Sequence, residues 1–137
     1  MKVFAMRVEV VNDMVVPRKG EIIEIENTLK AKQDFVGGTI QCVSINDEID
    51  LIVNDDGKLI GLPLNRAWLY KDKLIDLIVG NAFCCRHEGS EFTDIKESDI
   101  PAILESLVGV VQQGNNLYMM NEDTLDNFYK IQKSREK

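Results

Sequence analysis

The stretch that decides the fold is Thr39 to Gly61, "TIQCVSINDEIDLIVNDDGKLIG". Its two runs rich in β-branched residues, 39–45 and 49–55, are separated by the turn formers Asn46 to Glu48. Such runs favour two antiparallel strands joined by a hairpin. A second turn, with Gly57 expected at positive φ, leads into a further strand. The stretch therefore predicts an antiparallel meander.

The segments on either side fit an antiparallel sheet with short helices. Residues 2–11 alternate well enough for a strand, and a second strand follows the turn before Ile22. Residues 27–38 predict a helix that is capped by Asn27 or Thr28 and ended by a Gly-Gly pair. Residues 73–87 predict a strand that is broken or bulged near Gly80.

Two helices are expected in the C-terminal third and one beside the meander. The sequence predicts helices over 98–111 and 121–137, and a two-turn helix over 64–70. The expected fold is α+β: one domain over 1–137, with a sheet-rich core at 1–97 and a C-terminal helical pair at 98–137.

Composition excludes several classes of protein. The 137 residues carry a net charge of -7, which disfavours broad nucleic-acid binding, and solubility explains this acidity better than DNA mimicry. No apolar run is long enough to span a bilayer, and the N-terminus does not match a secretory signal. The expected location is the cytoplasm.

The Asn65-Arg66 pair is the best candidate for a binding site. A guanidinium beside the free N–H groups of a helix start suits an anionic oxygen, such as that of a phosphate. The structural alternative is an Arg66 side chain that pairs with Asp76 or a helix C-terminus, with Asn65 as a simple cap. The residues alone favour this alternative.

Four further residues are weaker candidates for the same ligand site. Lys58 would add positive charge, Trp68 would stack on a base, and Gly37 with Gly38 would let the backbone approach a phosphate. Each also has an ordinary interpretation: a solvated lysine, a core aromatic and the C-cap of a helix.

Catalytic and metal-binding patterns are scarce. The three cysteines form no CxxC motif, and one histidine, His87, is too few for a typical zinc site. Cys85 and His87 share a strand face, but no third group is evident that would orient the imidazole. The sequence therefore predicts no enzyme, no catalytic residue, no metal and no cofactor, with a Cys85–His87 hydrolase as a remote alternative.

Four motifs, "VGGTIQ", "VNDDGKLIGLPLNRAW", "DLIVGNAF" and "EFTDI", follow one another within residues 22–99. Together they resemble a family of uncharacterised small proteins encoded mainly by phages, plasmids and other mobile elements of Gram-positive bacteria. The family pattern maps onto Gly37, Gly38, Ile40, Asn54, Gly57, Lys58, Gly61, Leu62, Pro63, Asn65, Arg66, Ala67, Asp76, Gly80, Phe92 and Thr93. The chain departs from it at Trp68, where a smaller aliphatic residue is expected, and in its longer C-terminal tail.

The resemblance implies that the protein belongs to a mobile element, but it implies no particular ligand or reaction. It makes the ligand-site interpretation of Arg66 as well supported as the structural one. The leading hypothesis is a non-catalytic anti-defence protein that sequesters a nucleotide-type signal or another small phosphorylated ligand in the host cytoplasm. The alternative is an acidic protein that docks on a host defence enzyme, using a tail rich in Leu125, Phe128 and Tyr129. A homodimer that encloses the ligand is also expected.

Overall fold

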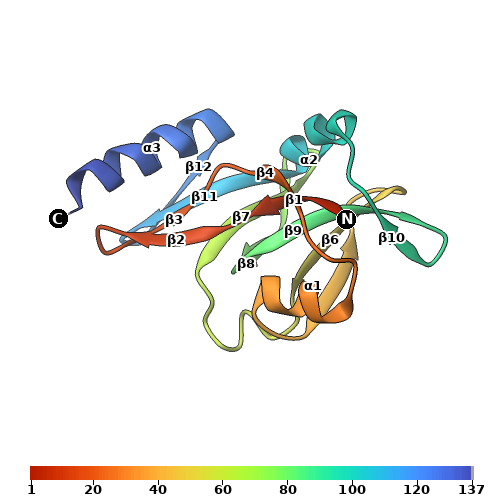
Figure 1. Ribbon diagram of the computed structural model, residues 1–137. Coiled ribbons are helices and arrows are strands. Elements are labelled where there is room, and N and C mark those ends of the chain that lie inside the picture. The colour runs from red at the N-terminus through yellow and green to blue at the C-terminus, as the bar shows by residue number, and fades with distance from the viewer. Residues whose placement is uncertain (137) are drawn as a thin grey trace.

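The computed structural model describes residues 1–136, and its central hairpin agrees with the prediction. Strands β5 (Ile40–Ser44) and β6 (Ile49–Asn54) pair antiparallel. Figure 1 shows β6 next to β9 (Ala82–Glu88), with which it also pairs. The Asn46 side chain fixes the turn between them, because its Oδ1 accepts a hydrogen bond from the Ile49 N–H at 2.9 Å.

The meander ends after β6, and the residues that follow the turn at Gly57 do not form the expected third strand. Residues 55–61 form turns, and Gly57 does not have the predicted positive φ. Glycine is needed there for another reason: a Cβ at Gly57 would lie 2.9 Å from Cγ2 of Val79. Gly61, four residues later, has the left-handed backbone, with φ +71°.

The strands form two sheets and one separate hairpin. The six-stranded sheet has the order β4-β1-β9-β6-β5, with β10 paired to β9, and the four-stranded sheet has the order β12-β11-β7-β8. The remaining bounds are β1 Lys2–Met6, β2 Val8–Val11, β3 Met14–Pro17, β4 Glu21–Glu24, β7 Leu64–Tyr70, β8 Lys73–Val79, β9 Ala82–Glu88, β10 Glu91–Thr93, β11 Leu107–Gln113 and β12 Asn116–Met120. Strands β2 and β3 pair with each other.

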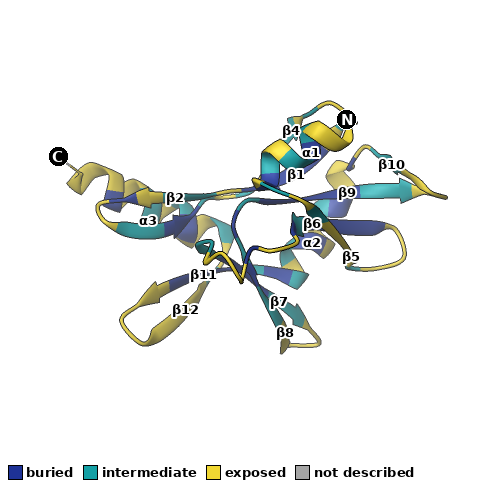
Figure 2. Cartoon of the chain, turned by 90° about the horizontal axis from the view of Figure 1, so that it is seen from below, coloured by how far each residue is buried: buried dark blue, intermediate teal, exposed yellow. Residues whose placement is uncertain are grey.

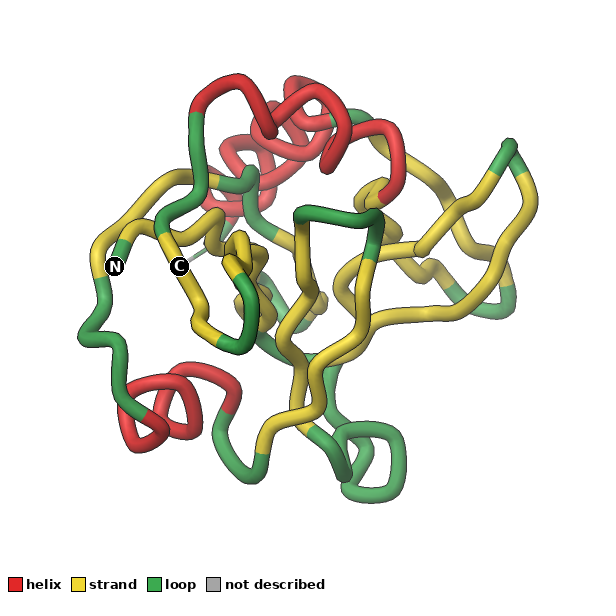
Figure 3. Tube along the Cα trace, turned by 90° about the vertical axis from the view of Figure 1, so that its right-hand side faces the viewer, coloured by secondary structure: helices red, strands yellow, loops and turns green. Residues whose placement is uncertain are grey.

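Three α-helices and one short 3-10 helix cover the sheets. Their bounds are α1 Leu29–Val36, η1 Glu97–Asp99, α2 Ile100–Ser106 and α3 Glu122–Arg135. Figure 3 shows α1 on one side of the strands, and α2 with α3 on the other. Helix α1 begins and ends as predicted, with Thr28 as its N-cap and Gly37 as its left-handed C-cap at φ 80°.

The hydrophobic core lies in two parts. The larger part packs the six-stranded sheet, through side chains such as Phe4 and Leu51, against Ile78 and Leu107 of the four-stranded sheet. The smaller part lies under α1, where the rings of Phe35 and Phe83 meet edge to face at 5.3 Å. The prediction of an α+β fold made mainly of antiparallel strands is confirmed.

Two of the predicted helical segments are strands. Residues 64–70 form β7, which is central in its sheet because β11 and β8 pair with its two sides. Helix α2 stops at Ser106, and Leu107–Gln113 continues as β11. A helix over 98–111 would break the pairing of β11 with β7, and this pairing outweighs the local propensity. The expected C-terminal helical pair is therefore interrupted by two strands.

None of the helices described over residues 1–136 combines the length and the apolar character needed to cross a membrane.

Candidate functional site

The predicted binding pair, Asn65 and Arg66, lies inside the protein. Both residues have 0% of their surface exposed, and they sit on β7 instead of at a helix start. The Asn65 amide donates hydrogen bonds to the backbone oxygens of Met6 and Gly80, at 3.0 and 2.8 Å. Asn65 therefore ties β7 to β1 and to the turn between β8 and β9, which is a structural role.

The Arg66 guanidinium is held by three acceptors from three segments. Nη1 donates to Oδ1 of Asn65 at 2.6 Å, and Nη2 donates to the Arg18 carbonyl oxygen at 2.7 Å and to Oε2 of Glu122 at 3.4 Å. The other oxygen of Glu122 accepts a hydrogen bond from the Gly20 N–H at 2.8 Å. Burial lowers the pKa of Arg66, and the Glu122 carboxylate opposes this shift.

An outward guanidinium at a helix start was the wrong expectation for Arg66. Its side chain joins the loop after β3, strand β7 and the first turn of α3, so it is a structural cation. The structural alternative predicted that Arg66 pairs with Asp76 or with a helix C-terminus. In the structure, Asp76 pairs with Lys58, and Arg66 pairs with Glu122. In this arrangement a ligand from solvent does not reach Arg66.

The other predicted ligand residues do not converge on Arg66. Lys58 and Asp76 form an ion pair whose side chains are about half exposed, beside β8. Gly37 ends α1, and Gly38 lies under Asn54, whose Nδ2 would come within 2.8 Å of an added Cβ. Trp68 is partly buried against the core between the sheets. Gly37 and Trp68 therefore have the ordinary roles weighed in the sequence, a helix C-cap and a core aromatic.

A polar cluster that the sequence did not predict surrounds Asp50 on β6. Asp50 is 5% exposed, and its carboxylate contacts Nδ1 of His87 at 3.0 Å and Oγ of Ser44 at 3.2 Å. Antiparallel pairing places Ser44 and Cys85 directly opposite Asp50. The alternation of these strands was the signal that could have revealed this cluster, once the register was known.

The thiols near Asp50 have raised pKa values. Burial and the charge of Asp50 raise the pKa of Cys42 to about 11 and the pKa of Cys85 to about 12. Only a small fraction of either thiol is therefore ionised near neutral pH, and the thiolate is the reactive form. Within residues 1–136, no group of three or more His, Cys, Asp or Glu side chains is placed to hold a metal ion.

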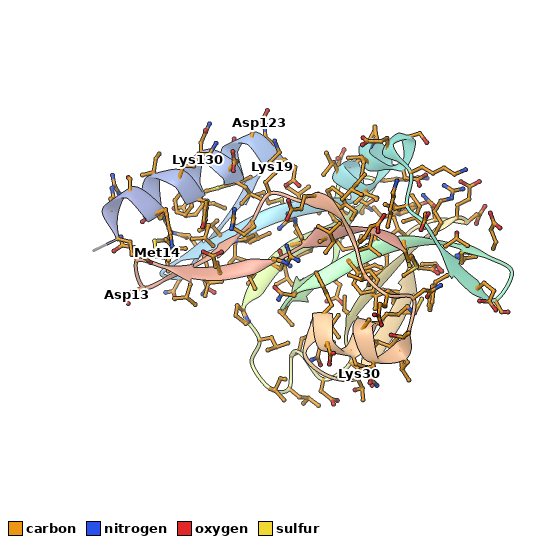
Figure 4. All side chains as sticks on the ribbon, viewed as in Figure 1. Asp13, Met14, Lys19, Lys30, Asp123 and Lys130 are labelled. Carbon is orange, nitrogen blue, oxygen red and sulfur yellow. The ribbon has the colours of Figure 1, made fainter. Side chains whose placement is uncertain are left out.

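Two of the cavities that contain cations, both lined by Lys19, are balanced by acids of the protein. A cavity of about 500 Å³ lies between α2 and the start of α3, and its one cation, Lys19, faces Glu122 and Asp123. Lys19 Nζ lies 3.7 Å from Asp123, and Figure 4 shows both side chains at the start of α3. A second cavity, of about 310 Å³, holds three cations, but Arg7 is paired with Glu21. Neither cavity presents a free cluster of cations to a phosphate.

A further hollow lies along the four-stranded sheet. This groove, of about 760 Å³, is lined by the β2–β3 turn, the loop after residue 61, strand β8 and the β11–β12 hairpin. Most of its side chains are aliphatic, among them Met14, Leu62, Leu77 and Leu117, and Asp13 is its single titratable residue. We call it the apolar groove.

The edge of the sheet beside the apolar groove is also apolar. Strand β12 contains no charged residue and pairs only with β11. Its Leu117, Tyr118 and Met119 are 48%, 45% and 54% exposed, and Figure 2 shows the strand in yellow at the rim. The sequence analysis singled out no residue of this strand.

Comparison with known protein families gives one match, which covers residues 6–108 and is described as a domain of unknown function, DUF3846. The chain belongs to the DUF3846 family. The predicted membership of an uncharacterised family is thus confirmed at the level of the family. No curated protein and no solved structure matches the chain.

The DUF3846 match ends inside β11, so β12 and α3 lie beyond it. Arg66 belongs to the matched segment, whereas Glu122 does not. Their contact therefore attaches the C-terminal helix to the DUF3846 domain. The face of α3 expected to dock on a partner is turned inward: Leu125 is fully buried, and the Tyr129 hydroxyl donates to Glu9 at 3.0 Å.

Proposed function

We propose that this DUF3846 protein is a non-catalytic binding protein that acts by docking another protein in its apolar groove. The observation that carries the proposal is the groove itself, about 760 Å³ in volume and lined mainly by partly exposed aliphatic side chains. Apolar surface of this kind, left open to water, is typical of a site that a partner covers.

The net charge of the chain and the lining of the groove indicate the chemistry of the partner. The chain has a net charge of -7, whereas the groove has Asp13 as its one titratable group. A basic protein that presents aliphatic side chains would be attracted at long range by the charge and held at short range by the groove. In the mobile-element setting that the resemblance implies, this partner would be a host defence enzyme in the cytoplasm, inhibited by the contact.

Sequestration of a small phosphorylated ligand has weaker support. That hypothesis rests on Arg66, which is enclosed and already donates to three acceptors. A hydrolase using Cys85 also has weak support, because this thiol is buried and its pKa is raised to about 12.

A matched pair of variants tests the groove. Met14→Lys places a cation in the groove, and Leu29→Lys makes the same kind of change on α1, where Leu29 is 59% exposed and outside the groove. Tagged wild type and both variants are mixed with lysate of the bacterial host, and the captured proteins are identified by mass spectrometry.

The proposal predicts one basic protein that is retained by wild type and by Leu29→Lys and lost with Met14→Lys. Its retention should also weaken as salt is added. Equal capture by all three proteins, or no capture, contradicts the proposal. Native mass spectrometry of protein taken directly from cells provides the second readout, since a retained nucleotide would favour the small-ligand hypothesis instead.

A further inference from the structure

Strand β12 leaves a row of main-chain groups open on its outer side. The β11–β12 hairpin has a two-residue turn in which Gly114 has φ +61°, and Gln113 is opposite Asn116. Since hydrogen-bonded and outward-facing residues alternate along such a strand, Leu117 and Met119 direct their N–H and C=O groups away from β11. Within residues 1–136, no other backbone or side-chain group bonds to them.

Two other strand edges in the molecule, β8 and β4, carry charges that discourage pairing, as exposed edges in natural proteins usually do. At β8, the Asp76 carboxylate pairs with Lys58 and accepts a hydrogen bond from the Leu77 N–H at 2.8 Å. Strand β4 begins and ends with Glu21 and Glu24. Strand β12 contains no charged residue, and its three consecutive large apolar side chains point alternately to the two faces of the sheet.

We propose that β12 pairs antiparallel with β12 of a second copy of this chain, about a two-fold axis that passes through Tyr118. In this register, Leu117 and the partner's Met119 exchange both of their main-chain hydrogen bonds, and the symmetric pair does the same. The two four-stranded sheets become one continuous sheet. Tyr118 faces its own copy across the axis.

The symmetry of the edge favours a second copy in this orientation. Leu117 and Met119 lie one residue on either side of Tyr118, and both direct their main-chain groups outward. An antiparallel second copy therefore matches the outward-facing donors and acceptors of both residues about a single two-fold axis.

The dimer would also extend the apolar groove. Leu117 lines the groove, and pairing sets it beside the partner's Met119 on the same face of the sheet. The grooves of the two copies would then meet at the axis. The inference itself rests on β12 and stands whether or not the proposed docking function is correct.

The first test compares two variants of the full chain by sedimentation velocity over a range of concentrations. Leu117→Lys and Leu74→Lys add the same charge to exposed leucines at the two edges of one sheet, since Leu117 is 48% and Leu74 is 53% exposed. We expect wild type and Leu74→Lys to dimerise, and Leu117→Lys to weaken the dimer at least about tenfold.

Salt separates this self-association from docking on a basic protein. Two copies of net charge -7 repel each other, so added salt should strengthen the dimer. A wild-type chain that stays monomeric at all concentrations overturns the inference. So does a dimer that Leu117→Lys leaves intact while circular dichroism shows both variants folded.

The second test uses a disulfide to check the register of the two paired β12 strands. In a Cys42→Ser background, which removes the exposed native thiol, Tyr118→Cys places two cysteines opposite each other on the axis. Their Cα atoms would be about 4.5 Å apart, within the range of about 4.4 to 6.8 Å that a disulfide requires. Mild oxidation should give a disulfide-linked dimer. Tyr70→Cys, at a tyrosine that is 61% exposed elsewhere, should not; equal cross-linking of both variants rejects the register.

Discussion

Arg66 and strand β12 reverse the usual placement of polar and apolar groups. The arginine side chain of Arg66, in the DUF3846 segment, is fully enclosed, whereas three large apolar side chains on β12 are about half exposed. Arg66 is compensated by three acceptors, whereas within residues 1–136 no strand pairs with the outer edge of β12.

This difference distinguishes a residue that stabilises the fold from a surface that can recognise another chain. A buried cation that is matched by Glu122 holds segments together and offers nothing to solvent. An apolar edge with open main-chain groups contributes little to the monomer and can recognise another chain. The comparison therefore moves the search for function from the motif around Arg66 to the C-terminal hairpin.

The largest effect is expected from Arg66→Met, which would leave the Glu122 carboxylate buried without its cation. Breaking a buried pair in this way destabilises a protein by about 3–5 kcal/mol. Urea unfolding of wild type, Arg66→Met and the double variant Arg66→Met with Glu122→Gln measures it, and the double variant should recover part of the loss. A loss below about 1 kcal/mol would show that Arg66 is not a structural residue.

Proline substitutions test which groups of β12 face outward. Tyr118→Pro removes an N–H that bonds to β11 and should destabilise the fold by about 3 kcal/mol. Met119→Pro removes an N–H that faces solvent, so the loss should stay below about 1 kcal/mol under dilute conditions where the chain is monomeric. The same unfolding experiment checks both, and equal losses would mean that the assigned register is wrong.

A smaller loss of stability is expected from a change at Glu122, where α3 meets the loop after β3. Glu122→Gln keeps the shape of the side chain but removes its charge, and should destabilise by about 1–3 kcal/mol. The matched control is Asp123→Asn, because Asp123 is 91% exposed and its ion pair with Lys19 is long at 3.7 Å. The control should change stability by less than about 0.5 kcal/mol. Comparable losses in the two variants would remove the special role given to Glu122.

The smallest effect concerns the reactivity of Cys42, the exposed thiol beside the Asp50 cluster. Its pKa is raised to about 11, so the thiolate fraction is small at pH 8 and grows as pH rises toward that value. Alkylation by iodoacetamide should therefore accelerate about tenfold between pH 8 and pH 9. Asp50→Asn removes a nearby negative charge, which lowers this pKa and should speed the reaction at pH 8. An unchanged rate in that variant would contradict the assigned cause.

Much of the fold could be predicted from local sequence. The hairpin of β5 and β6, the caps of α1 at Thr28 and Gly37, and the N-cap of α3 at Asn121 each follow from residue types within a few positions. These signals act locally, so a single sequence reveals them.

The segments whose secondary structure was predicted wrongly depend on distant partners. Residues 64–70 and 107–113 are strands because they pair with each other, and neither segment alone carries the signal for that pairing. Gly109 illustrates the point, since a Cβ there would lie 2.2 Å from Cδ1 of Leu125 on α3. A glycine that reads as a helix residue in the sequence is a packing residue in the fold.

The candidate site failed for a related reason. The ligand-site interpretation of Asn65 and Arg66 depended on an exposed helix start, and a central strand buries both residues instead. Their partner Glu122 is 56 residues away along the chain from Arg66, so no local pattern could have revealed the pair. The open edge at β12 was equally hidden, because an edge exists only once the order of the strands is known.

The most direct test of the central claim, that β12 is an open edge which a second copy covers, is amide hydrogen exchange measured by NMR at low and at high protein concentration. The account predicts that the Tyr118 amide, bonded to β11, is protected at both concentrations. The Leu117 and Met119 amides should exchange rapidly when the protein is dilute and become protected when it is concentrated. Leu117 and Met119 amides that exchange equally fast at both concentrations, or that are already protected in the dilute monomer, would contradict it.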